Sequence, residues 1–155
     1  HEFDFTARCQ HSIEQMTPLA EARQITLKAG LPKHQFYFGN ELLIGSSLNH
    51  LLENAIQFSH QGGTVSLKLA VEKNELVLTI RDNGPGLPNF ASERAFERFY
   101  SFRPSEQKNG KGNGLGLAFV KEVTELHHGT ASLKSHPEGG AEATLTFPIP
   151  KKEQS

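Results

Sequence analysis

The chain has 155 residues, which suits one globular domain and is enough to bury a sizeable core. Hydrophobic residues make up 36% of it and charged residues 21%, both ordinary values for a folded domain. The 16 Lys and Arg residues nearly balance the 17 Asp and Glu residues, and no block of basic residues stands out, so we expect no nucleic-acid partner.

Cys9 is the single cysteine, so an internal disulfide is excluded and a reducing compartment fits the chain. No apolar run approaches the roughly 20 residues that a membrane-spanning helix needs. No signal peptide is visible either. Because the chain begins at His1, we expect it to be part of a longer protein.

The first half of the chain is expected to form two helices with two short strands between them. Apolar residues at spacings of three and four predict a helix over 4–23, which Pro18 should disturb near its end. Short strands are predicted at 25–30 and 36–38, and a longer helix at 41–58.

The second half is expected to form two hairpins on either side of an irregular stretch and a helix. The first hairpin joins strands 64–72 and 76–82 through Lys73-Asn74-Glu75. The remaining predicted elements are an irregular region at 83–113 with one helical turn at 91–95, a helix at 115–127, a hairpin of strands 130–135 and 143–149, and a frayed tail at 151–155.

Hairpins dominate this order of elements. The predicted fold class is therefore α+β: a two-layer α/β sandwich with a mixed, mostly antiparallel sheet and helices on one face. Residues 1–150 are expected to form a single domain. Strands and helices do not alternate as in a Rossmann fold, and the Walker A string G-x-x-x-x-G-K-[ST] is absent from the sequence.

The segment RDNGPGLP at 81–88 closes a strand and opens a loop. Asp82 places a carboxylate at the strand end, where it can accept a hydrogen bond from an exocyclic amine. Gly84 and Gly86 lack a Cβ atom and would let a flat ligand approach the backbone. The alternative interpretation is an ordinary Asp-Asn-Gly turn.

Four glycines alternate with other residues at the start of the helix predicted at 115–127, in the string GKGNGLGLA. A helix N-terminus presents unpaired N–H groups and favours phosphate, and glycines would let phosphate touch them. The alternative is a flexible linker followed by a helix. The preceding residues 101–113 contain one apolar residue, Phe102, and are expected to form a functional lid.

Polar residues on the helix at 41–58 form a third candidate feature. Glu53, Asn54 and Gln57 lie away from its apolar stripe. The amide oxygen of Asn54 would suit Mg²⁺ if it faces a pocket. The alternative is that all three side chains are solvated.

Five motifs carry a resemblance to a known family: LLENAIQFS, RDNGPGLP, FERFY, GNGLGLAFV and GGAEATLTFP. Their order and spacing resemble the catalytic and ATP-binding domain of bacterial sensor histidine kinases over about residues 41–150, with 4–38 matching more loosely. The C-terminal part looks most like sensor kinases of the CreC type. The wider family includes gyrase, Hsp90 and MutL ATPases and shares the Bergerat α/β sandwich.

The resemblance implies an adenine site and a magnesium site. Asp82 matches the acid that binds the adenine amino group, and Gly84 and Gly86 match the glycines beside the base. Phe58 matches the aromatic residue that packs against adenine. Asn54 matches the asparagine that coordinates the Mg²⁺ bridging the ATP phosphates.

The resemblance also implies a phosphate site. Its implied residues are Arg98 in the FERFY box, Lys111 (or Lys108) in the lid, and Gly112, Gly114 and Gly116 with Leu115 and Leu117 at the lid hinge and phosphate turn. Thr144 matches a threonine near adenine in the last motif. The implied catalytic residues are Asn54, Arg98 and, as a group that accepts a proton or polarises the acceptor, Glu53.

Two positions depart from the family pattern. His50 stands where the family usually has an asparagine, and Gln57 stands where it commonly has a lysine that touches phosphate. The loss of one positive charge is expected to weaken ATP binding. Histidine is a residue type that can be neutral or charged near pH 7, so His50 is expected to make ATP binding depend on pH.

The implied function is transfer of the ATP γ-phosphoryl group to a histidine on a helical dimerisation domain outside this chain. A response regulator would be an indirect partner, and a homodimer would form only through that missing domain. The chain would then be the cytoplasmic part of an inner-membrane sensor. Two alternatives stay open: an ATPase that drives a conformational clamp, and a nucleotide-sensing module without catalysis. His50 argues against the first, because such relatives place a catalytic glutamate at that position.

Overall fold

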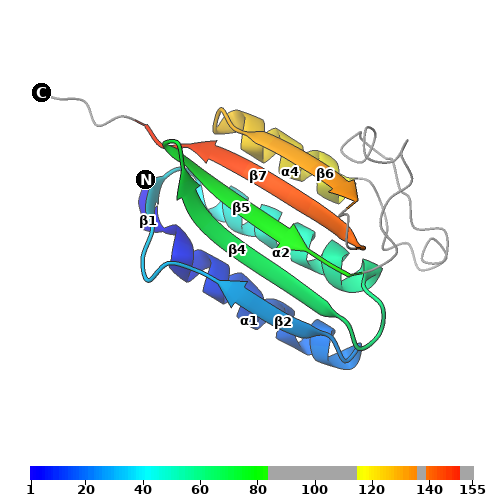
Figure 1. Cartoon of the computed structure of the whole chain (residues 1–155). Coiled ribbons are helices and arrows are strands. Elements are labelled where there is room, and N and C mark those ends of the chain that lie inside the picture. Colours follow the sequence, from blue (N-terminus) through cyan, green and yellow to red (C-terminus); the bar gives the residue numbers. More distant parts are fainter. Residues whose placement is uncertain (84–114, 136–138, 151–155) are drawn as a thin grey trace, which may run out of the picture.

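The computed structural model describes residues 1–83, 115–135 and 139–150, which form a helical layer on one face of a sheet (Figure 1). The described elements are β1 (Glu2–Asp4), α1 (Phe5–Ala22), β2 (Thr26–Gly30), β3 (Phe36–Phe38), α2 (Glu41–Phe58), β4 (Thr64–Glu72), β5 (Glu75–Arg81), α4 (Leu115–Leu126), β6 (Thr130–Ser135) and β7 (Ala141–Pro148). This arrangement confirms the predicted α+β two-layer sandwich.

The main sheet has five strands in the order β2-β4-β5-β7-β6. β2 pairs with β4 in parallel, and every other pair in this sheet is antiparallel, as the hairpin pattern predicted. Lys73 and Asn74 have φ angles of 48° and 66°, so they form the two-residue turn between β4 and β5 that suits the twist of a hairpin.

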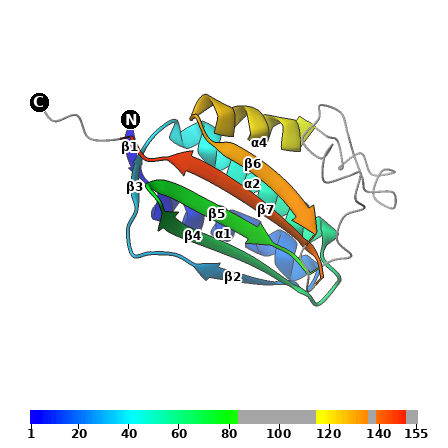
Figure 2. The same cartoon turned by 45° about the horizontal axis from the view of Figure 1, so that its top comes forward.

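The core lies between the sheet and the helices, all of which cover the same face (Figure 2). The strands β5 and β7 alternate buried and half-buried residues, as expected when only one face of a sheet is covered. The largest fully buried side chains are Phe5, Ile44, Leu48, Leu52, Ile56, Val65, Leu67, Leu76, Leu78, Val120, Leu145 and Phe147. The apolar residues of α2 among them explain why this helix sits at the centre of the helical layer.

Two features of the N-terminal half differ from the sequence-based expectation. α1 continues past Pro18 to Ala22, because packing against α2 outweighs the single backbone N–H that proline lacks. β1 was not predicted: its three residues pair with β3, from Glu2 opposite Phe38 to Asp4 opposite Phe36. A strand this short has no readable periodicity.

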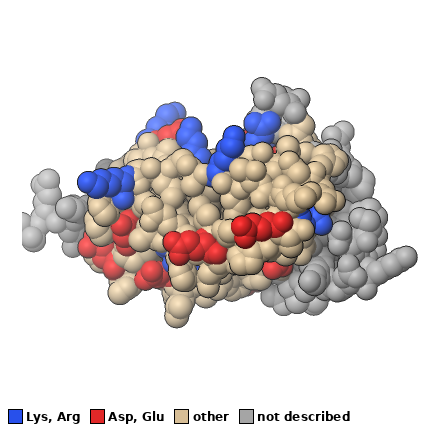
Figure 3. Space-filling model, turned by 90° about the horizontal axis from the view of Figure 1, so that it is seen from below, with Lys and Arg blue, Asp and Glu red and all other residues tan. Residues whose placement is uncertain are grey.

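Figure 3 views the molecule from the side on which α1 and β2 lie in Figure 1. Acidic side chains are spread over the middle of this face, and Lys and Arg side chains lie along its margins. This face therefore carries mixed charge rather than a continuous basic surface. In the part of the chain that the structure describes, no helix is both long enough and apolar enough to span a membrane.

Candidate functional site

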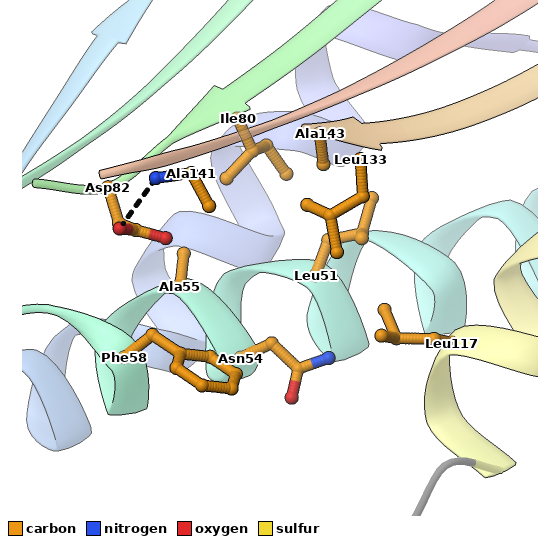
Figure 4. Close-up of a pocket in the computed structure, with 10 residues that line it drawn as sticks. All are labelled: Leu51, Asn54, Ala55, Phe58, Ile80, Asp82, Leu117, Leu133, Ala141 and Ala143. Atoms are coloured by element: carbon orange, nitrogen blue, oxygen red, sulfur yellow. Dashed lines mark hydrogen bonds between the residues drawn. The ribbon is translucent and has the colours of Figure 1, made fainter. Parts of the chain in front are cut away.

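A slot opens between the sheet and the helices at the end of β5 (Figure 4). β5 ends there, β7 begins there, and the second half of α2 and the first turn of α4 complete the walls. The residues that line it are Leu51, Asn54, Ala55, Phe58, Ile80, Asp82, Leu117, Leu133, Ala141 and Ala143. Segments far apart in the sequence thus converge on one concave site.

The slot is narrow and largely apolar. Its cavity volume is about 30 Å³. Asn54 and Asp82 are the two polar residues among the ten that line it. This composition suits a flat apolar group that carries a few hydrogen-bonding atoms.

Asp82 follows β5 directly and is only 5% exposed. Its Oδ1 accepts a hydrogen bond from the backbone N–H of Ala141 at 3.1 Å, and its own N–H donates to the Ala141 carbonyl at 3.0 Å. Because side chains alternate along a strand, Asp82 and Ile80 point to the same side of the sheet, into the slot. The slot therefore contains a buried carboxylate whose direction is fixed by a hydrogen bond.

Asn54 and Phe58 lie one turn apart on α2, so both face the slot. In Figure 4, Asn54 lies between Phe58 and the start of α4. The C-terminal end of α2 is held by Arg23, which comes from the end of α1. Its guanidinium donates to the backbone carbonyls of Ile56, Gln57 and Ser59 at 3.2, 3.4 and 3.0 Å.

The first turn of α4 forms the opposite wall. Leu115 begins the helix, and the side chain of Leu117 lines the slot. The N–H groups of a first helical turn have no partners within the helix, and the helix dipole gives this end partial positive charge. The apolar slot therefore opens toward an end of a helix that favours anions.

His50, one of the two departures from the family pattern, is exposed on α2 and contacts α4. Its ring meets the ring of Phe119 edge-on, with centroids 5.5 Å apart. A Cβ atom on Gly116 would lie 3.2 Å from the His50 Nδ1. Glycine at 116 therefore allows the exposed imidazole to contact the first turn of α4.

Two residues with predicted roles do not line the slot. Glu53 follows Asn49 by one turn, and the Asn49 amide donates to Gln15 of α1 at 3.1 Å, so Glu53 lies toward α1. Thr144 lies between buried Ala143 and Leu145 on β7, so it points to the opposite, solvent-facing side of the sheet. This placement corrects the expectation of a contact between Thr144 and adenine.

Several predicted site residues lie outside the described residues. They are Gly84, Gly86, Arg98, Lys111, Gly112 and Gly114, together with the lid at 101–113, the helical turn at 91–95 and the tail at 151–155.

Sequence reasoning missed part of the sheet-side wall. Ile80, Ala141 and Ala143 were not named as site residues, yet they flank Asp82. The alternation of apolar residues along β5 could have predicted that Ile80 faces the slot, and the same alternation along β7 could have predicted it for Ala143. The small residues Ala141 and Ala143 at the start of β7 leave room beside the Asp82 carboxylate. A search for motifs of polar residues does not detect such small apolar residues.

The resemblance implies Mg²⁺, and the described residues offer a limited donor set for it. No group of three or more His, Cys, Asp or Glu residues that could hold a metal occurs in residues 1–83, 115–135 and 139–150. Asn54 and Asp82 carry the oxygen donors of the slot wall. Because the Asp82 Oδ1 already accepts the Ala141 N–H, the Asn54 amide is the candidate ligand for Mg²⁺. One protein ligand fits an ion that keeps several waters and binds substrate phosphates.

The comparisons with known proteins agree with this geometry. Residues 39–151 match the family described as histidine kinase-, DNA gyrase B- and HSP90-like ATPases. This match covers most of the chain and includes every described residue of the slot, so the chain belongs to that family.

Individual relatives are sensor kinases. The chain is 36% identical over 132 residues to the sensor histidine kinase TmoS of Ectopseudomonas mendocina, covering 84% of this chain and 14% of TmoS. It is 42% identical over 104 residues to the sensor protein CreC of Escherichia coli K12, covering 66% of this chain and 21% of CreC. CreC is thus among its relatives, as the sequence pattern predicted, and the chain spans under a quarter of either protein.

A solved structure shows the same architecture. The mycobacterial sensor histidine kinase MprB superposes with a TM-score of 0.83 at 26% identity, over 96% of this chain and 97% of that one. The predicted Bergerat sandwich of the histidine kinases is thereby confirmed.

Proposed function

We propose that this chain is the ATP-binding catalytic domain of a sensor histidine kinase and that the slot beside Asp82 receives the adenine base. The observation that carries the proposal is the oriented carboxylate of Asp82 in a largely apolar slot. A carboxylate there accepts a hydrogen bond from the amino group of adenine, and the apolar walls exclude water from the faces of the base.

The positions of Phe58, Asn54 and α4 support one proposed direction for the nucleotide. The base lies against Phe58 and Asp82, and the phosphates extend past Asn54 toward the first turn of α4. Asn54 would hold Mg²⁺, which neutralises phosphate charge when it is bound. The phosphate contacts of Arg98, Lys111, Gly112 and Gly114, and the base contacts of Gly84 and Gly86, stay predictions from the resemblance.

The proposed reaction is phosphoryl transfer to a histidine on a dimerisation domain. An imidazole nitrogen forms a bond to the γ-phosphorus, the bond from that phosphorus to the bridging oxygen breaks, ADP leaves, and the imidazole N–H proton passes to solvent. A neutral imidazole is already nucleophilic, so positioning and charge stabilisation supply most of the catalysis. Glu53 lies outside the slot, so no base role is assigned to it.

The setting of the whole protein is part of the proposal. The relatives are much longer than this chain, which agrees with a separate dimerisation domain, with homodimerisation through that domain and with an inner-membrane sensor whose cytoplasmic part contains this chain. A response regulator would receive the phosphoryl group afterwards.

The test mixes this chain with the dimerisation domain of its own full-length protein and ATP labelled at the γ-phosphorus. We expect label on that domain that is lost in acid, because phosphohistidine has an acid-labile P–N bond, and no label when the acceptor histidine is replaced. Release of phosphate without labelled protein would point to the conformational ATPase. Binding without either reaction would point to the nucleotide-sensing module.

A further inference from the structure

Two glycines, Gly139 and Gly140, directly precede β7, where the backbone meets the residues that follow β5. Gly140 is buried and has a φ of +83°, in the left-handed region that glycine adopts readily. A Cβ atom at this position would lie 2.7 Å from the carbonyl carbon of Asp82 and 2.8 Å from the Cα of Asn83. Both neighbours are backbone atoms, so a side chain here would force the two strands apart.

The same close approach fixes the carboxylate of Asp82. The residue after Gly140 supplies the N–H that binds the Asp82 Oδ1 at 3.1 Å, and its carbonyl accepts the Asp82 N–H at 3.0 Å. On the other side, the Asn83 Oδ1 accepts the N–H of Thr64 at 3.1 Å, which ties this strand end to the start of β4. The direction of the carboxylate therefore depends on how closely the backbone of β7 approaches.

We propose that Gly140 is a positioning residue for recognition of the base. By allowing β7 to lie against Asp82 and Asn83, it keeps the Ala141 N–H where it holds the carboxylate toward the slot. A side chain at position 140 would shift Asp82. This shift would weaken the preference for a base that carries the 6-amino group of adenine. This inference rests on the proposed binding of an adenine nucleotide in the slot.

Gly139 provides a matched control within the same turn. It also has a positive φ, +103°, but a Cβ atom there would meet no atom within 4 Å. Gly139→Ala therefore introduces left-handed strain without steric overlap, whereas Gly140→Ala introduces both. Any effect seen in Gly140→Ala alone comes from the contact with the end of β5.

The experiment compares affinities for ATP and for purine riboside triphosphate, which lacks the 6-amino group. Calorimetry is run on the parent 155-residue chain and on the two variants. We expect the parent and Gly139→Ala to prefer ATP by the same factor. Gly140→Ala should lose about 10- to 150-fold in ATP affinity, the value of a hydrogen bond to a charged group, with little change for the analogue.

Several results would overturn the inference. An equal loss for both ligands in Gly140→Ala would show a structural role only, and an unchanged preference would show no role. A parent that does not prefer ATP would overturn the proposed base site and, with it, the role of Gly140.

Circular dichroism reports whether Gly140→Ala folds. If Gly140→Ala does not fold, the amide signal of Ala141 in the NMR spectrum of the parent tests whether β7 responds to the base. We expect that signal to shift on adding ATP and to shift much less on adding the analogue. Equal shifts would contradict the link between the base, the carboxylate and β7.

Discussion

At the scale of single residues, Phe58 is the aromatic side chain among the ten that line the described slot. It is partly exposed in this structure and lies one turn from Asn54 on α2. A partly exposed aromatic ring in the wall of a largely apolar slot suits stacking on a base. The Phe58 ring would contribute to binding through contact area with the base and not through hydrogen bonds.

Replacing Phe58 by alanine should therefore weaken ATP binding without unfolding the domain. Stacking between a base and an aromatic ring is worth about 1–3 kcal/mol, so we expect a loss of roughly 5- to 150-fold in affinity. Calorimetric titration with ATP measures it. Phe58→Leu is the control and should lose less, because leucine keeps much of the apolar surface; wild-type affinity in Phe58→Ala would place the base elsewhere.

Cys9 is fully buried, and burial raises the pKa of its thiol to about 12. The thiolate is the reactive form, so very little of it exists at pH 8 in the folded protein. We expect a thiol-reactive dye to label the native chain far more slowly than the chain unfolded in denaturant. Equal labelling rates would mean that α1 does not pack against the core as described.

At the scale of elements, the end of α2 depends on Arg23. Three backbone carbonyls at the end of α2 accept hydrogen bonds from the Arg23 guanidinium. Its positive charge also interacts favourably with the negative end of the helix dipole. These bonds connect the end of α1 to the turn of α2 that carries Phe58.

Arg23→Ala should destabilise the protein by about 1.5–3 kcal/mol, the range for hydrogen bonds to a charged group. Urea unfolding followed by circular dichroism measures the change. Arg23→Lys keeps the charge but not the planar fork, so we expect only partial recovery. A variant as stable as the parent would show that the carbonyls are equally well satisfied by water.

The start of α1 depends on Asp4. Burial acts to raise the pKa of its carboxyl, but hydrogen bonds from the Gln35 N–H, the His34 ring and the Thr6 N–H act against it, and the pKa is lowered overall. A group whose pKa is lower in the folded state adds stability above its unfolded pKa, about 3.9 for aspartate, and loses it as pH falls through the folded value.

Asp4→Asn keeps an N-cap oxygen but removes the charge. The parent should therefore be more stable than this variant near pH 6, and the difference should shrink as pH falls below about 4. Urea unfolding of both proteins across this pH range tests the prediction. A difference that grows on acidification would contradict the assigned hydrogen bonds.

At the scale of the whole molecule, most of the architecture was predictable because α2, β4, β5 and β7 have long, regular apolar patterns. β1 was not, since three residues gain their structure only from β3, which lies more than thirty residues away. The single domain over 1–150 stays a prediction.

The site was predictable where a residue type and its position agreed. Asp82, Asn54 and Phe58 all reach the slot, whereas Thr144 was assigned from its motif without regard to strand alternation. With Ala143, Leu145 and Phe147 facing the core, the sequence pattern itself places Thr144 on the outer face. The contact of His50 with α4 depends on tertiary packing and could not be read from sequence spacing.

The most direct measurement is the affinity of Asp82→Asn for ATP by calorimetry. Asparagine keeps an oxygen that can accept the Ala141 N–H, but it turns a donor group toward the adenine amine. We expect affinity to fall about 10- to 150-fold while the thermal midpoint of unfolding changes little. If the folded variant binds ATP as tightly as the parent, adenine does not bind at Asp82.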